Sequence, residues 1–221
     1  MAQAESRAQL PTRLIVGLIL GAALLIAVSF AVGRISVPAE TTPSSTSAEA
    51  GFARDMQTHH HQAVEMSMMI RDETDDPDIR LLAYDIATTQ AQQAGQMYGW
   101  LTLWGLPQAA PEPAMTWMER PAPGGGGHAH GGSASTHVAG GPMPGLATDE
   151  QLRQLKSLTG VEAEKLFLQL MIAHHRGGIE MAEAVLDRST DPTVDSLAGA
   201  MAKAQQSEID YMETLLAERG A

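Results

Sequence analysis

The chain has 221 residues and no cysteine, which excludes a disulfide framework, a thiolate metal site and a cysteine nucleophile. It carries 26 acidic against 14 basic residues, and a net charge of −12 argues against nucleic acid as a partner. Only 4% of the residues are aromatic, too few for a β-sandwich or barrel, whereas 13 are methionine. We therefore expect a helical, methionine-rich protein.

The first predicted element is the uncharged apolar run of residues 14–32. As a helix it would span roughly 28 Å, close to the hydrocarbon thickness of a bilayer. Arg7 and Arg13 precede the run, so the positive-inside rule places the N-terminus in the cytoplasm. We expect residues 1–34 to be a cytoplasmic tip and a single-pass transmembrane anchor, with the rest of the chain extracytoplasmic. A cleaved signal peptide is the alternative, and the domain would then be secreted.

The remaining chain divides by composition. Residues 35–48, rich in Pro, Ser and Thr, are predicted to be a disordered spacer. Residues 49–219 are predicted to be one duplicated domain, with repeat 1 at 49–105 and repeat 2 at 148–219. The linker of 106–147 is rich in Gly and Pro, and we expect it to lack regular structure.

The duplication is visible as one pattern that recurs at an offset of 115 residues. Residues 52–66 read F-x3-M-x2-HH-x3-VEM, and residues 167–181 read F-x3-M-x2-HH-x3-IEM. The same offset pairs Met97 with Met212 further along the chain. A register kept without gaps indicates two copies of one unit.

Each copy is predicted to be a helical hairpin, because its apolar residues recur every three or four positions. The pairs Asp76-Pro77 and Asp191-Pro192 are typical of a helix N-cap followed by proline and would start the second helix of each hairpin. Two hairpins that bury their stripes against each other make an all-α four-helix bundle. Residues 148–151 resemble a capping box that opens a short extra helix. Gly177-Gly178 inside a helix predicts a close helix approach.

The repeated histidines and methionines suggest a metal site. Helical phase turns His59 and His174 inward, with His60 and His175 beside them. Imidazoles and thioethers without thiolates form a ligand set suited to copper, above all Cu(I), or to silver. The predicted ligands are Met56, His59, His60, Met66, Met171, His174, His175 and Met181, with Met97 and Met212 as axial or entry contacts. We expect them to converge in one interior cluster. His128, His130 and His137 of the linker are predicted auxiliary ligands.

Two other readings stay open. In the first, the bundle is a structural or interaction module without metal, in which Gln90, Gln93, Gln205 or Glu208 hydrogen-bonds the buried imidazoles. In the second, it is a metal-dependent oxidoreductase. The sequence shows no nucleophile–base pair and no cofactor loop, so we do not expect an enzyme. The metal-binding prediction is compatible with a homo-oligomer or with a partner protein that receives the metal.

The repeat resembles the domain-of-unknown-function family 305, on FARDMQTHHHQAVEM, FLQLMIAHHRGGIEMA and the trailing AKAQQSEIDYM. The resemblance implies a ferritin-like, extracytoplasmic bundle, and copper binding by analogy with members tied to copper resistance. Its role would be sequestration or handover of metal. Two departures affect repeat 1, where His61 stands opposite Arg176 and Gln93 opposite Glu208. They imply that the first half-site is altered.

Overall fold

The computed structural model describes residues 11–36, 42–122 and 138–220. Within these ranges the chain is all-helical, with six α-helices, one short 3-10 helix and no strand. The predicted all-α class is confirmed, and the ferritin-like assignment stays a prediction. The elements are α1 (Thr12–Ser36), α2 (Ala48–Glu73), α3 (Pro77–Leu103), η1 (Thr116–Glu119), α4 (Asp149–Ser157), α5 (Gly160–Leu186) and α6 (Pro192–Glu218).

Helix α1 belongs to a unit of its own, residues 1–42, apart from the helical unit of residues 43–221. Its described side chains are exposed throughout, although nearly all are apolar. Residues 12–34 are long and apolar enough to cross a membrane, a property that an N-terminal signal sequence shares. The predicted apolar N-terminal helix is therefore present.

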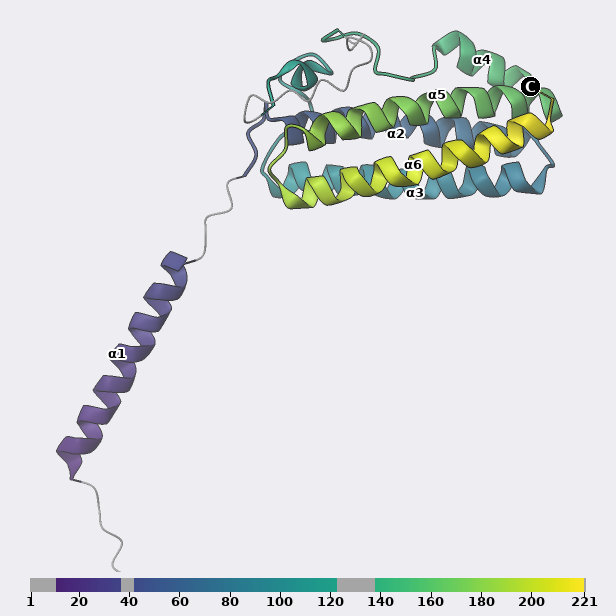
Figure 1. The fold of residues 1–221 in the computed structure, drawn as a ribbon. Helices are drawn as coiled ribbons and strands as arrows, with labels where there is room; N and C mark the ends of the chain where they lie inside the picture. Colours follow the sequence, from purple (N-terminus) through teal and green to yellow (C-terminus); the bar gives the residue numbers. More distant parts are fainter. Residues whose placement is uncertain (1–10, 37–41, 123–137, 221) are drawn as a thin grey trace, which may run out of the picture. The chain divides into compact units, whose positions relative to one another are not determined.

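The helical unit consists of two hairpins, α2–α3 and α5–α6, whose four long helices run alongside one another (Figure 1). Helices α2 and α5 pack together and join the hairpins, and α4 lies against this pair. Local sequence explains where the helices start. Asp76 and Asp191 accept hydrogen bonds from first-turn N–H groups that would otherwise lack partners, and a proline follows each. Thr148 and Gln151 form the predicted capping box of α4.

The buried apolar residues fall into two clusters, one toward each end of the hairpins. The Arg219-end cluster, so named for the ion network described next, includes Met66, Ile70, Ile79, Phe167, Met171, Met212 and Leu215. The linker-end cluster includes Phe52, Met56, Met97, Leu101, Trp117, Met181 and Val185.

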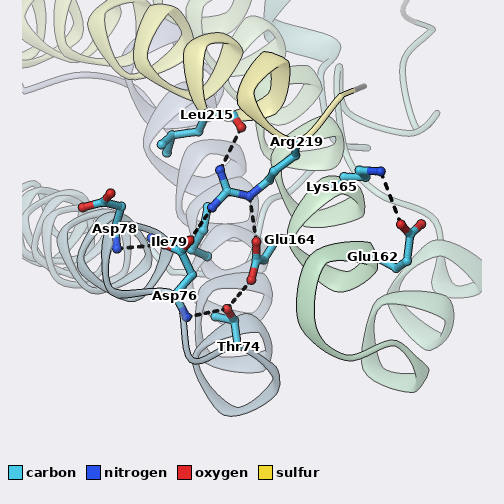
Figure 2. A network of polar contacts seen from close by, with 9 residues as sticks. All are labelled: Thr74, Asp76, Asp78, Ile79, Glu162, Glu164, Lys165, Leu215 and Arg219. Carbon is cyan, nitrogen blue, oxygen red and sulfur yellow. Dashed lines mark hydrogen bonds and ion pairs between the residues drawn. The ribbon is translucent and has the colours of Figure 1, made fainter.

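A polar network ties the four long helices together at the Arg219 end (Figure 2). The Arg219 guanidinium donates to Glu164 at 2.7 Å and to Asp76 at 2.8 Å, and also to the carbonyl of Leu215. Thr74 donates its hydroxyl proton to the second oxygen of Glu164 at 2.5 Å. Since these residues come from the ends of α2 and α6 and the starts of α3 and α5, the network fixes both hairpins in one register.

The linker contributes to the core at the other end, contrary to the expectation that it lacks structure. Trp117 of η1 is 1% exposed, packs edge-on against Phe52 with ring centroids 6.0 Å apart, and donates its indole N–H to Asp55. A Cβ at Gly51 would overlap the Trp117 ring, so glycine is what admits the indole there. Periodicity could not show this packing, because a loop has no helical or strand repeat.

Candidate metal centre

The two His-His pairs lie together where α2 contacts α5. All four side chains are fully buried, including His60 and His175, which phase analysis had placed only beside the inward stripe. The rings of His59 and His174 are in contact, with centroids 3.8 Å apart and planes tilted by 35°. The centroid distances to the adjacent rings are 6.5 Å for His59–His60 and 6.2 Å for His174–His175. The imidazoles of both repeats therefore form one buried group.

The central pair is oriented by backbone carbonyls. His174 bonds the carbonyl of His59 through Nε2 at 2.9 Å. His59 does not bond its counterpart in return, and its Nε2 instead lies 3.0 Å from the carbonyl oxygen of Pro144 in the linker. A carbonyl oxygen only accepts, so Nε2 carries the proton in both rings and Nδ1 presents a lone pair.

The outer pair is oriented by side chains of the partner helices. Nε2 of His60 lies 2.8 Å from the amide oxygen of Gln93, and Nε2 of His175 lies 2.6 Å from the carboxylate of Glu208. Of the four polar residues expected to satisfy the imidazoles, these two do so. The two outer rings therefore differ in the charge of their partner, an amide for His60 and a carboxylate for His175.

The four Nδ1 atoms are buried and have no hydrogen-bond partner among the residues that the structure describes. Burial lowers the pKa of His59 to about 4 and that of His60 to about 3. Burial likewise lowers the pKa of His174 well below its ordinary value. These three rings are therefore neutral at pH 7, the form in which an imidazole nitrogen can bind a metal.

All six predicted methionine ligands are fully buried, but they lie in two clusters and not in one. Since His59 lies between Met56 and Met66 along α2, the imidazoles separate the two methionine sets. Each set combines residues of both repeats: Met56, Met97 and Met181 at the linker end, and Met66, Met171 and Met212 at the Arg219 end.

Gln90 and Gln205 form a second symmetric pair of buried polar groups. They are 2% and 3% exposed, and neither amide group has a hydrogen-bond partner within the described parts of the chain. A Cβ at Gly178 would overlap the Gln205 amide, so the glycine makes room for a polar side chain and not for a neighbouring backbone. Buried amides without partners cost free energy, so this level of the interior holds polar groups that could still accept or donate a hydrogen bond.

Residues 143–147, here called the strap, close the linker over the histidines. A Cβ at Gly177 would overlap the Pro144 carbonyl, and one at Gly145 would overlap the carbonyl of Ala173. Gln62 holds the strap from α2, accepting from the N–H of Ala147 at 2.7 Å and donating to its carbonyl at 2.9 Å. The expected close approach at Gly177-Gly178 thus involves the strap and a glutamine, and sequence reasoning missed the part played by Pro144.

Across the described parts of the chain, no three His, Asp or Glu side chains gather in an arrangement that could hold a metal ion. An ion held by fewer than three imidazoles can complete its coordination with thioether sulfur. The donors present suit such an ion, because the imidazole lone pairs are flanked by methionines along the helices. The auxiliary ligands predicted in the linker, His128, His130 and His137, lie outside the described residues.

Comparisons with known proteins agree with the repeat pattern. The model of the family described as domain of unknown function (DUF305) matches residues 49–216. A DUF305 protein of Streptomyces coelicolor has a similar structure, with 49% identity, 80% of this chain and 97% of that chain covered, and a TM-score of 0.69. The Cu(I)-bound form of CopM is 21% identical, covers 78% of this chain and 96% of its own, and has a TM-score of 0.56, which shows a shared fold.

A shorter match is to protein L153 of Acanthamoeba polyphaga mimivirus, 38% identical over 56 residues. That match takes in 25% of this chain and 37% of the viral protein, so the chain spans about a third of that relative. The family match and the CopM likeness agree with the prediction that the chain is not an enzyme.

Proposed function

We propose that this chain, which belongs to the DUF305 family, binds copper as Cu(I) among its buried histidines and methionines, for sequestration or handover of the metal. The observation that supports this most is the set of four buried Nδ1 atoms without partners. In each ring the other nitrogen is already engaged, so the free lone pair is the one available to a metal. Proposed ligands are the six methionines and four histidines given above.

Donor chemistry favours a soft ion. Thioether sulfur and imidazole nitrogen are neutral ligands that suit Cu(I) and Ag(I), whereas zinc and iron sites usually include carboxylates or thiolates. Among the described residues that hydrogen-bond the four rings, Glu208 alone is charged. CopM, which shares the fold, is described in Cu(I)-bound, Cu(II)-bound and Ag-bound forms. This likeness supports the choice of metal without fixing its site.

We also propose that α1 stays attached and anchors the helical unit outside the cytoplasm. Its support is the length of the apolar helix and the arginines that precede it. The test is the mass of the native protein after membrane fractionation. An intact N-terminus in the membrane fraction supports an anchor, and a shortened soluble form shows that the segment is a cleaved signal.

Competition between the full chain and a Cu(I) chelator, in detergent and without oxygen, tests copper binding. The quadruple variant His59→Ala, His60→Ala, His174→Ala and His175→Ala is expected to lose at least tenfold in affinity. The matched control is His61→Ala, because His61 is exposed next to the same pair. Equal affinity in the quadruple variant and the wild type would show that the histidines serve packing alone. Oxygen-dependent turnover of a cuprous or ferrous substrate would favour an oxidoreductase instead.

A further inference from the structure

The linker end of the core is much richer in methionine than the Arg219 end. Three of its methionines come from the linker itself, and Met115, Met118 and Met143 are 0%, 6% and 9% exposed. The buried methionines of the linker-end cluster are Met56, Met97, Met115, Met118, Met143, Met181 and Met201. Those of the Arg219-end cluster are Met66, Met171 and Met212.

The duplication does not explain this surplus. It supplies three methionines to each cluster, and the additional ones are the linker residues and Met201, which stands where repeat 1 has Ile86. Leucine or isoleucine would fill similar volume and lose less side-chain freedom on burial. The Arg219 end is packed in that ordinary way, with leucine, isoleucine and phenylalanine. Packing alone therefore gives no reason for the thioethers at the linker end.

Met115 has a backbone conformation that residues other than glycine rarely adopt. Its φ of +66° makes it the single non-glycine residue with positive φ in the described ranges. Glycine would fit this backbone without strain, yet the position carries a methionine whose side chain is completely buried in the cluster. Strain that persists at a particular side chain is a sign that the side chain has a use.

Asp55 holds Met115 in this position. One carboxylate oxygen accepts from the N–H of Met115 at 2.7 Å and from the indole N–H of Trp117 at 2.9 Å. The residue is 5% exposed, and burial raises its pKa, which shows that the interior penalises its charge. A buried carboxylate is thus used to fix the segment that brings linker thioethers to α2.

We propose that the linker methionines Met115, Met118 and Met143 complete a second soft-metal site at the linker end, one that binds Cu(I) or Ag(I) through thioether sulfur alone. Met56, Met97 and Met181, proposed above as ligands beside the histidines, lie in the same cluster, so the second site would adjoin the histidine site and share these sulfurs with it. This inference rests on the proposed function and extends it, because it gives the two ends of the molecule different capacities for metal.

The ligand class follows from the donors. Thioethers are uncharged and polarisable, so they favour a soft monovalent ion over hard divalent cations, which require oxygen ligands and lose strong hydration on burial. Mg²⁺ and Ca²⁺ are therefore excluded as occupants. Since such a site contains no imidazole, it also differs from the histidine group in its response to acid, for thioethers do not titrate.

Silver titration of the full chain in detergent, in a chloride-free buffer, tests this site. The triple variant Met115→Leu, Met118→Leu and Met143→Leu keeps the apolar volume and removes three sulfurs. We expect it to bind one Ag(I) fewer per chain than the wild type, measured by calorimetry and by metal analysis after desalting. The control is Met68→Leu, because that methionine is 49% exposed and lies outside the linker-end cluster. It should bind as the wild type does.

Two further variants separate the possible failures. Met118→Leu with Met143→Leu leaves the strained position intact and should weaken binding of the same ion at least tenfold, with an unchanged circular dichroism spectrum. The quadruple histidine variant should keep this ion while it loses those bound by imidazole. Equal stoichiometry and affinity in the triple variant and the wild type would overturn the second site and leave the proposed function standing. A quadruple histidine variant that loses no ion would overturn the proposed function instead.

Discussion

The two ends of the helical unit are built from nearly the same repeated helices but differ in their cores and polar contacts. At the Arg219 end, a buried ion network and a core of leucine, isoleucine and phenylalanine tie four helices together. At the linker end, the core is methionine-rich, and glycines admit a loop that bonds one central histidine. The difference indicates that stability is concentrated at one end and ligand chemistry toward the other.

The largest expected effect comes from breaking the Arg219 network. Arg219→Ala leaves Glu164, whose side chain is 6% exposed, without its cation, and we expect a loss of about 3–5 kcal/mol in the free energy of unfolding. Urea denaturation measures it. Arg153→Ala, which removes an exposed ion pair with Glu150, should change stability by less than about 1 kcal/mol. If both variants lose equally little, stability is not concentrated at this end.

Acid should destabilise the metal-free protein through its buried histidines. The pKa of His59 is about 4 in the folded chain against 6.5 when it is free in water. Between these values the unfolded chain binds more protons, so the free energy of unfolding falls as the pH falls from 6.5 to 4, by about 3 kcal/mol for His59 alone. Above pH 6.5 the His59 ring is neutral in both the folded and the unfolded chain, so it causes no loss of stability there. Denaturation curves across this window that do not move would show that the ring is not buried as described.

Displacing the strap should have a smaller effect on stability. It tests whether the strap orients the His59 ring or only packs against it. Gly177→Ala places a Cβ against the Pro144 carbonyl, and we expect a loss of about 1–3 kcal/mol. His59 should also lose its fixed tautomer, which nitrogen chemical shifts of the imidazole report. Gly99→Ala, in α3 with open space around it, should instead stabilise by up to about 1 kcal/mol. An unchanged His59 tautomer in Gly177→Ala would contradict the role given to the strap.

The smallest expected effect distinguishes the outer histidines. Glu208→Gln gives His175 the kind of partner that His60 already has in Gln93. We expect Cu(I) affinity to fall about tenfold, because a carboxylate that accepts the other ring N–H orients a metal-binding imidazole and strengthens its electron donation. The reverse change, Gln93→Glu, should raise the affinity. Affinities that do not respond to either substitution would show that these partners do not tune the site.

Sequence periodicity was sufficient for the helices and their caps. The spacing of apolar residues and the Asp-Pro pairs gave hairpin helices that the structure confirms, and the capping box gave the start of α4. These features are local, so a short window of sequence contains what determines them. The inward position of His59 and His174 followed from the same helical phase.

Periodicity could not predict the contacts that linker residues make with the helices. Pro144 meets His59 from 85 positions away, and Met115 depends on Asp55 from 60 positions away. Such bonds leave no repeat in the sequence. Gly177 was a visible signal, since a glycine inside a helix is costly, but it did not reveal which segment approaches it. His60 is fully buried and bonds Gln93, a partner that the sequence left as one option among several.

Anomalous diffraction from crystals of the Cu(I)-loaded protein is the most direct test of the central claim. We expect an anomalous peak within bonding distance of Nδ1 of at least one buried histidine and of a methionine sulfur from the same interior. Peaks confined to surface carboxylates, with all four Nδ1 atoms still unbonded, would contradict it.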